Sequence, residues 1–485
     1  MTSSDSVPRA RADQPELTVR AILLGLGLSA LLGAANVYLG LKVGMTVSAS
    51  IPAAVVAMLA LRGGRSRGTV LEANQVQTAA SAGESLAAGI LFTVPALVLI
   101  GVWGRFDYWA TTLIAIAGGW LGVLFMIPMR RVFIEQSPEL PYPEGVACAA
   151  VLEAGLATAG EEVGPDDPAM PAAGASTESG GRVVAGGLLG AGVKLAVSGF
   201  GWLRGSIEGA LAAGPGRSLF LGADLSPALL AVGYIVGLPV ASQIFLGGAL
   251  GWLVLIPLAP EWVAGLAPED VRLLAVVEPG YEGAATERAW SLWSYGIRYV
   301  GVGAMAVGGL AALYRIRGGL RRAVAELRSG WSSLSGGRAS RSVDLPTPWI
   351  LGVGAAAVLL VLWLYWRFTG DLGVAVLAAA IMVVASFFFV GVASYIVGLV
   401  GNSTSPVSGM TITAVLATGA MLWLVGYSGT EGMIATLGVA AIVCCAACTA
   451  GDVCNDLKTG SIVGATPWRQ QSMQLAGVVI AALVM

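Results

Sequence analysis

The sequence predicts an all-α polytopic membrane protein, and three observations support this fold class. Apolar residues make up 56% of the 485 residues. Charged residues make up only 12% of the chain, whereas soluble proteins carry about 25%. Runs of about 20 apolar residues, the length that a helix needs to cross a bilayer, recur along the chain. A water-soluble globular protein is therefore excluded.

The apolar runs predict about 12–13 transmembrane helices together with re-entrant segments. In chain order the spans are 18–41, 45–62, 85–103, 109–129, 183–203, 225–240, 242–258, 293–315, 347–366, 372–400, 408–427 and 431–450. A last apolar run at 473–485 is too short to cross. This run is either an interfacial segment or the start of a further span, and we expect a chain that is truncated at its C-terminus.

The basic residues test this order of spans. Arginine clusters lie at 62–67, 130–131 and 315–341, after the second, fourth and eighth spans. The loop at 259–292 falls on the other side and carries six acids against two arginines. Cytoplasmic loops of membrane proteins carry the excess of Lys and Arg. We therefore expect a multi-pass protein of the cell inner (cytoplasmic) membrane with a cytoplasmic N-terminus.

Composition also divides the chain into four regions. Residues 1–17 form a polar cytoplasmic tail, and 18–315 form a first membrane half that contains an acidic linker at 160–181. Residues 316–346 form a basic cytoplasmic linker, and 347–485 form a second, related and incomplete membrane half. Both linkers are rich in small polar residues and lack an apolar face, which is typical of loops.

The histidine count of zero excludes several kinds of chemistry. A Ser-His-Asp triad, an HExxH zinc site and His-ligated haem all require imidazole. Five cysteines in apolar surroundings are more typical of small-residue helix packing than of a disulfide framework or a metal site. The net charge of −2 gives no basic field for nucleic acid. We predict no catalytic residues, no metal and no cofactor.

Two polar stretches interrupt the apolar background of the first quarter of the chain. Charge inside a membrane is costly, so it usually marks a pathway. Lys42 lies within the stretch 36–52, and the alternative is an extracellular hairpin whose lysine reaches the interface. The stretch 71–89 has helical composition and many polar residues, which suits the lining of a cavity. Its alternative is a cytoplasmic amphipathic helix.

Three further polar stretches follow. In 141–155, Glu144 comes after two prolines, where it either takes part in a site or caps a helix. The stretch 401–411 interrupts two apolar spans. In 451–471, Asp452 and Asp456 are four residues apart and share a helical face. Two close carboxyl groups can hold a proton in a chain without histidine. The alternative is a loop in which Lys458 forms a salt bridge.

The candidate substrate-binding or coupling residues come from these five stretches. They are Lys42, Glu72, Asn74, Gln77, Glu84, Glu144, Asn402, Ser405, Asp452, Asp456 and Lys458. Helices broken by Gly and Pro at comparable places in two halves are typical of secondary transporters.

Five strings of these residues resemble the oligopeptide transporter (OPT) family, in its bacterial branch. They are NVYLGLKVGMTVSASIP, LEANQVQTAASAGESLAAG, PYPEGVACAAVL, VGNSTSPVSGMT and GDVCNDLKTGSIVGATPW, in this order along the chain. The resemblance implies an all-helical membrane protein with an internal duplication and with further spans after Met485. It also implies proton-coupled uptake of small peptides or, in a sister branch, of metal chelates. The resemblance also implies that the substrate and coupling regions of the two halves are 71–89 and 451–471.

The leading interpretation is therefore a secondary active transporter that imports small oligopeptides, coupled to protons. The alternative is an importer of metal chelates, such as siderophores or metal complexes of amino-acid-derived chelators. An intramembrane enzyme, which would need a Ser–Lys or paired-Asp site, and a passive channel are the weaker alternatives. The expected partners are the peptide or chelate substrate, protons and the lipid bilayer, with a homo-oligomer left open and no nucleic acid.

Overall fold

The computed structural model describes most of the chain. The described residues are 14–43, 46–62, 68–138, 140–156, 185–186, 188–190, 192–193, 195–214, 216–225, 230, 238, 241–266, 271–278, 280–281, 283–315, 344–402, 405 and 407–485. The predicted linker 160–181 and residues 316–343 of the second linker lie outside them. The described chain divides into two compact units, one of 1–180 with 309–485 and one of 181–308.

The helical, polytopic fold class is confirmed. Within the described residues, six helices are long and apolar enough to cross a membrane, and a pair bent by 83° would make a seventh. The six spans are Val19–Lys42, Val70–Leu99, Tyr108–Glu135, Pro348–Thr369, Leu372–Leu399 and Gly429–Val463. The bent pair joins Ala241–Leu255 to Ala259–Gly265, at the predicted span 242–258. The sequence predicts about 12–13 such helices, so this part of the chain accounts for about half of them.

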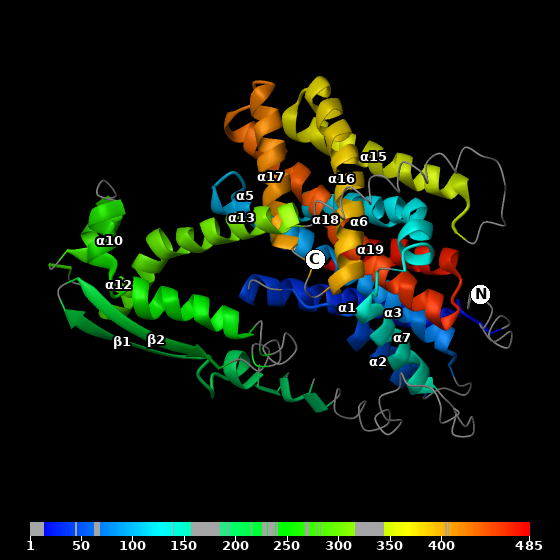
Figure 1. The fold of residues 1–485 in the computed structure, drawn as a ribbon, viewed down its shortest axis with the longest axis horizontal. Coiled ribbons are helices and arrows are strands. Elements are labelled where there is room, and N and C mark those ends of the chain that lie inside the picture. The colour runs from blue at the N-terminus through cyan, green and yellow to red at the C-terminus, as the bar shows by residue number, and fades with distance from the viewer. Residues whose placement is uncertain are drawn as a thin grey trace. The chain divides into compact units, whose positions relative to one another are not determined.

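The first unit contains all six of these spans (Figure 1). Its helices are α1 (Val19–Val43), α2 (Ser50–Arg62), α3 (Val70–Glu84), α4 (Leu86–Leu91), α5 (Val94–Leu99), α6 (Tyr108–Arg130), α7 (Pro143–Leu156), α15 (Thr347–Thr369), α16 (Leu372–Val400), α17 (Val407–Leu424), α18 (Gly429–Val463) and α19 (Pro467–Val484). A π-helical turn at Arg131–Glu135 extends α6. Both predicted halves of the sequence thus contribute helices to one compact unit.

Two predicted spans begin or end at the wrong residue. The third span does not begin at 85 but at Val70, because Thr69 caps the helix and Glu72 completes a capping box. The polar stretch 71–84 is therefore part of the span itself. The twelfth span does not end at 450, because α18 is 35 residues long and continues to Val463, where Gly464 ends it at a φ of +84°. The stretch that follows position 450 is helix to Val463, so the interpretation as a loop is wrong there.

Two other segments differ from expectation in kind. The second predicted span, 45–62, is helical only in α2, whose 13 residues cover about 20 Å against a hydrocarbon core of about 30 Å. Residues 46–49 precede this helix without regular structure. The last run, 473–485, belongs to the longer helix α19, which starts at Pro467.

Close packing of small residues places α18 at the centre of the first unit. A Cβ on Gly118 of α6 would lie 2.5 Å from the Cβ of Cys445, and one on Gly122 would lie 2.5 Å from the carbonyl oxygen of Ala446. Cys444 and Cys448 are buried as free thiols on the same helix. These contacts agree with the interpretation of the cysteine cluster as small-residue packing between membrane helices.

Helices α1, α3 and α19 run side by side in the same direction. Arg20 near the start of α1 reaches Glu72 near the start of α3, and Ser29 further along donates to the carbonyl oxygen of Gly477 in α19. A Cβ on Gly33 would meet Ala481, one turn beyond Gly477. Helices α1 and α3 belong to the first and third predicted spans, which the charge pattern also orients alike, and α19 contains the last apolar run. Figure 1 shows them together in the first unit.

The second unit contains the strands. β1 (Ser206–Gly214) and β2 (Arg217–Asp224) form an antiparallel hairpin, which the sequence analysis did not predict. The described helices of this region are α10 (Ala259–Leu266), α11 (Val271–Val277), α12 (Ala285–Leu292) and α13 (Arg298–Arg315), with π-helical turns at Leu195–Gly199, Leu250–Leu255 and Trp293–Ile297. Phe220 stacks near Trp252 with ring centroids 4.5 Å apart, and this aromatic pair anchors the hairpin to the helices.

Candidate functional site

The polar stretch predicted at 71–89 forms the most deeply buried helix of the first unit. Fourteen residues of α3, from Leu71 to Glu84, are buried. Because a buried polar group needs a hydrogen-bond partner, each polar side chain of α3 must find one on a neighbouring helix. The partners separate α3 into two regions, one around Glu72 and one from Gln77 to Glu84.

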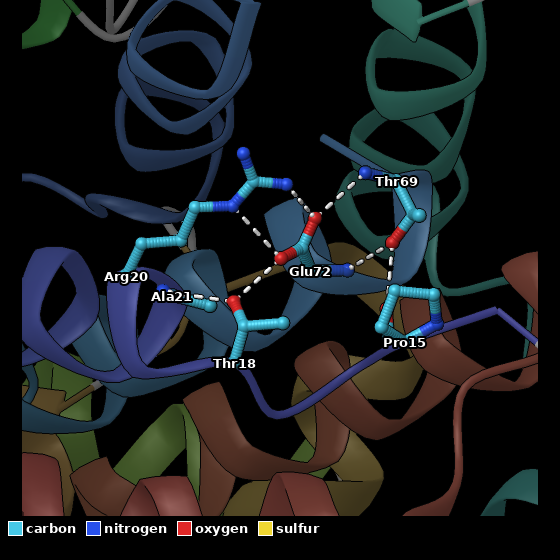
Figure 2. Close-up of polar contacts among 6 residues, drawn as sticks. All are labelled: Pro15, Thr18, Arg20, Ala21, Thr69 and Glu72. Atoms are coloured by element: carbon cyan, nitrogen blue, oxygen red, sulfur yellow. Dashed lines mark hydrogen bonds and ion pairs between the residues drawn. The ribbon is translucent and has the colours of Figure 1, made fainter. Parts of the chain in front are cut away.

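The region around Glu72 is an ion-paired helix start (Figure 2). Arg20 donates to Glu72 through Nε at 3.0 Å and through Nη2 at 2.7 Å. The hydroxyl of Thr18 donates to the same carboxylate at 2.5 Å, and the backbone N–H of Thr69 donates to it at 2.9 Å. The bonds from Arg20 and Thr18 join the start of α1 to the start of α3, and the bond from Thr69 completes the capping box of α3. Glu72 thus has a structural role in the described fold.

A second acid strengthens the same end of the unit. Glu16 accepts from the hydroxyl of Thr466 at 2.6 Å and from the backbone N–H of Thr466 at 3.0 Å. Arg469 forms an ion pair with Glu16 at 3.2 Å, and Gln75 donates to it at 3.2 Å. Both acids at this end therefore have an arginine partner.

The second region of α3 faces a cluster of three carboxyl groups, Glu84, Asp452 and Asp456, which we call the carboxylate cluster. Asn402 donates to Asp452 at 2.6 Å, and the hydroxyl of Ser81 donates to it at 3.3 Å. Asp452 is 3% exposed and Asp456 is fully buried. Helix α18 thus presents both aspartates to α3.

The other two members of the carboxylate cluster are held in the same way. Asp456 accepts from Gln77 and, at 3.3 Å, from Ser50. Glu84 accepts from Asn36 and, at 3.2 Å, from the backbone N–H of Ala49. Each donor to the cluster in these hydrogen bonds is a neutral amide or hydroxyl. The ion pairs of the described residues include no member of the cluster.

The carboxylate cluster lies far from the ends of the two membrane spans that carry it. Ser81 is 11 residues after the start of the span Val70–Leu99, and Asp452 is 11 residues before the end of α18. At about 1.5 Å per residue, each is about 17 Å from the nearer end of its span. The hydrocarbon core of a bilayer is about 30 Å thick, so this distance corresponds to its middle.

Two short helices begin at this depth. Helix α2 starts next to Ala49, whose backbone N–H donates to Glu84. Helix α7 starts beside Asn455, because a Cβ on Gly145 would lie 2.9 Å from the side-chain oxygen of Asn455. With 13 and 14 residues, both helices are too short to span the core. Irregular backbone at membrane depth occurs where it is enclosed by protein or lines a cavity.

Comparison with known proteins now decides the family. The sequence model of the family described as OPT oligopeptide transporter protein matches residues 16–485. A protein of the bacterium Haemophilus influenzae named "Putative oligopeptide transporter" is 34% identical over an alignment of 470 residues, and the match covers 92% of this chain and 68% of that protein. The chain belongs to the OPT oligopeptide transporter family. It is a transporter and not an enzyme, so the intramembrane-enzyme alternative is set aside.

In this OPT transporter, five of the predicted site residues meet in one place. Gln77, Glu84, Asn402, Asp452 and Asp456 all belong to the carboxylate cluster or donate to it. Glu144 lies close by, because a Cβ on Gly401, the neighbour of Asn402, would be 2.8 Å from its carboxyl oxygen. The roles of these residues in transport remain predictions.

The other predicted residues lie elsewhere. Glu72 is at the start of α3, and Asn74, one turn before Gln77, donates to the side-chain oxygen of Gln77 at 3.2 Å. Lys42 is exposed at the end of α1. Ser405 is half-buried, and its backbone forms hydrogen bonds with Asn402 and Val407. Lys458 is half-buried, and its Nζ lies 5.7 Å from the ring centre of Tyr142.

Sequence reasoning missed several residues of the site. Asn36, Ser50 and Ser81 contact the carboxylate cluster, and Asn455 lies beside it on α18. Each of them lies in one of the polar stretches that interrupt the apolar runs, which is the signal that could have found them.

Proposed function

We propose that this OPT transporter imports small oligopeptides and couples their uptake to protons through the carboxylate cluster. The observation that carries the proposal is the burial of Glu84, Asp452 and Asp456 among neutral donors only. Three buried carboxylates without a cation would be strongly destabilising if all were ionised. A cation must therefore accompany them, and two are at hand, a proton and the ammonium group of a substrate.

This requirement gives a simple form of coupling. A proton that enters the cluster neutralises one carboxyl group, and the ammonium of a bound peptide neutralises another. If only one of the two cations is bound, a buried carboxylate keeps its charge without a partner. The state that holds both the proton and the peptide is therefore favoured over the state that holds one of them. Binding of the proton and binding of the peptide thus support each other.

The chemistry of the cluster favours peptides over metal chelates. A peptide presents an ammonium group to the acids. A chelate that carries carboxylates around its metal would instead be repelled by them. The chelate importer and the passive channel are therefore outcomes that the experiment must distinguish.

The test is uptake by proteoliposomes of the purified protein. Labelled trialanine and a labelled iron chelate are compared with and without an inwardly directed proton gradient. We expect trialanine to accumulate above its outside concentration only with the gradient and to be released by a protonophore. Accumulation of the chelate but not of the peptide would contradict the proposed cargo. Uptake that never exceeds the outside concentration would show a channel.

We also propose that the protein lies in the cytoplasmic membrane with the N-terminus inside. The shared direction of α1 and α3 supports this orientation, since the charge pattern gives the first and third predicted spans the same sense. Both arginine-paired acids, Glu16 and Glu72, would then lie at the cytoplasmic end. The test is a reporter that is active only in the cytoplasm, fused to the N-terminus. We expect an active reporter, and an inactive one would show that the N-terminus lies on the other side of the membrane.

A further inference from the structure

Asn455 of α18 is a buried polar side chain whose partners the fold does not supply. Its exposed fraction is 0%, and neither its amide nitrogen nor its amide oxygen has a hydrogen-bond partner among the described residues. Buried amides in native proteins are nearly always hydrogen-bonded. An amide that lacks both partners indicates a place where a ligand or water completes the bonds.

Asn455 faces the start of α7. A Cβ on Gly145 would lie 2.9 Å from both the backbone oxygen and the side-chain oxygen of Asn455, and 3.4 Å from the Cβ of Lys458. Thr459 fixes this approach, because its hydroxyl donates to the carbonyl oxygen of Gly145 at 3.0 Å. Glycine at 145 thus lets the first turn of α7 lie directly against Asn455 and Lys458.

Lys458 brings a positive charge to the same place. It shares a helical face with Asn455, three residues earlier. Its Nζ lies 5.7 Å from the ring centre of Tyr142, and the described ion pairs do not include it. Tyr142 is itself fixed, by a backbone hydrogen bond to Gly398 at 2.9 Å and by a contact of its hydroxyl with Cys454 at 2.9 Å.

The first turn of α7 adds the positive end of a helix. The early backbone N–H groups of a helix lack intrahelical partners and favour negative charge. One acid, Glu144, belongs to the same turn, and its carboxyl oxygen lies against Gly401. An amide, an ammonium group and a helix N-terminus are the donors that recognise a carboxylate.

We propose that Asn455, Lys458 and the first turn of α7 form a subsite for the C-terminal carboxylate of the transported peptide. The amide nitrogen of Asn455 donates to the carboxylate, and its amide oxygen accepts the last N–H of the peptide. Asp456, the next residue of α18, belongs to the carboxylate cluster and has one carboxyl oxygen without a partner among the described residues. Helix α18 thus offers an anion site beside a cation site, which suits a zwitterion. This inference rests on the proposed function, since it presumes a peptide cargo.

The test is the binding of trialanine and of trialanine amide to the purified protein in detergent, measured by calorimetry. We expect the protein to prefer the free acid by about tenfold or more, the size expected for a charge-assisted contact. Lys458→Met is expected to reduce this preference to within about threefold. Asn455→Asp keeps the shape of the side chain and sets a negative charge against the ligand. It is expected to weaken trialanine binding by about tenfold and to leave trialanine amide nearly unchanged.

Two comparison variants make the result specific. Lys42→Met removes the same charge from the exposed end of α1 and should keep the preference of the original protein. Asp452→Asn should reduce the preference for trialanine over N-acetyl-trialanine and should keep the preference for the free carboxylate. Thermal unfolding of each variant in detergent shows that it is folded.

The outcomes separate the two proposals. If the protein neither binds nor takes up trialanine, the proposed function is wrong. If it takes up trialanine but Lys458→Met and Asn455→Asp keep the full preference for the free acid, the carboxylate subsite is wrong and Asn455 holds water only.

Discussion

The two ends of α3 carry the same side chain in opposite settings. Glu72 has an arginine, a hydroxyl and a backbone N–H around its carboxylate (Figure 2). Glu84 has an asparagine and a backbone N–H around its carboxylate, with two aspartates of α18 nearby, and no cation bonds it among the described residues. A carboxylate that is paired with a fixed arginine is already neutralised and does not need to bind another cation. A carboxylate without one can bind and release a cation, which coupled transport requires.

The largest expected effect comes from removing charge in the carboxylate cluster. Glu84→Gln and Asp452→Asn should each reduce gradient-driven peptide uptake by about tenfold or more, since an amide cannot bind the proton. Glu72→Gln is the matched control on the same helix, and uptake per folded molecule should be retained. The measurement is trialanine uptake in proteoliposomes, normalised to folded protein. If Glu72→Gln and Glu84→Gln lose the same fraction of uptake, the proposed difference between the two regions of α3 is wrong.

The next effect is on stability and belongs to the other end of α3. Arg20→Met leaves the fully buried Glu72 without its cation, and loss of one partner of a buried pair costs about 3–5 kcal/mol. We expect the low end of this range, because Arg20 is 34% exposed. Thermal unfolding in detergent measures the loss, and the double variant Arg20→Met/Glu72→Gln should recover part of it. No recovery would mean that Arg20 acts through packing and not through Glu72.

A third variant moves the carboxylate cluster without changing a charge. A Cβ on Gly122 would lie 2.5 Å from the carbonyl oxygen of Ala446 and 3.0 Å from Thr449, one turn before Asp452 on α18. Gly122→Ala should therefore destabilise the fold by about 1–3 kcal/mol and reduce uptake as well. Gly27→Ala on α1 is the control, because no atom lies within 4 Å of its Cβ position. Unfolding and uptake are measured on both, and an unchanged Gly122→Ala would show that α18 tolerates displacement.

The smallest expected effect tests the helix start alone. Thr69→Ala removes the cap whose hydroxyl accepts from the N–H of Glu72 at 3.0 Å. The loss of such a cap costs about 1 kcal/mol. We expect a small decrease in unfolding temperature with normal uptake. A loss of uptake larger than the loss of folded protein would give this end of α3 a role in transport.

The sequence predicts the membrane fold well because apolar length is a local property. It also finds Glu84, Asp452 and Asp456, since intramembrane acids are conspicuous in an apolar run. It cannot separate Glu72 from Glu84, because both lie in one polar stretch and differ only in their partners. The partner of Glu72 is Arg20, which is 52 residues away in the sequence, so no local pattern predicts this contact.

Helix ends were harder to predict than helices for a physical reason. The polar residues within 71–84 and 451–463 reduce the local hydropathy. The third predicted span therefore begins only at 85, and the twelfth ends already at 450. In the structure these residues are helical because other helices bury them and bond with them. Tertiary contacts thus override the local preference that the prediction uses.

The separation of the two polar helices along the chain affects how the protein is made. Ser81 and its partner Asp452 are 371 residues apart. At about 5–20 residues per second, synthesis of α18 follows that of α3 by roughly 20 to 70 seconds. During this interval Gln77 and Ser81 of α3 lack the aspartates that they bond in the folded protein. Until the C-terminal helices emerge from the ribosome, the available partners are those of the first helices, such as Ser50 for Ser81.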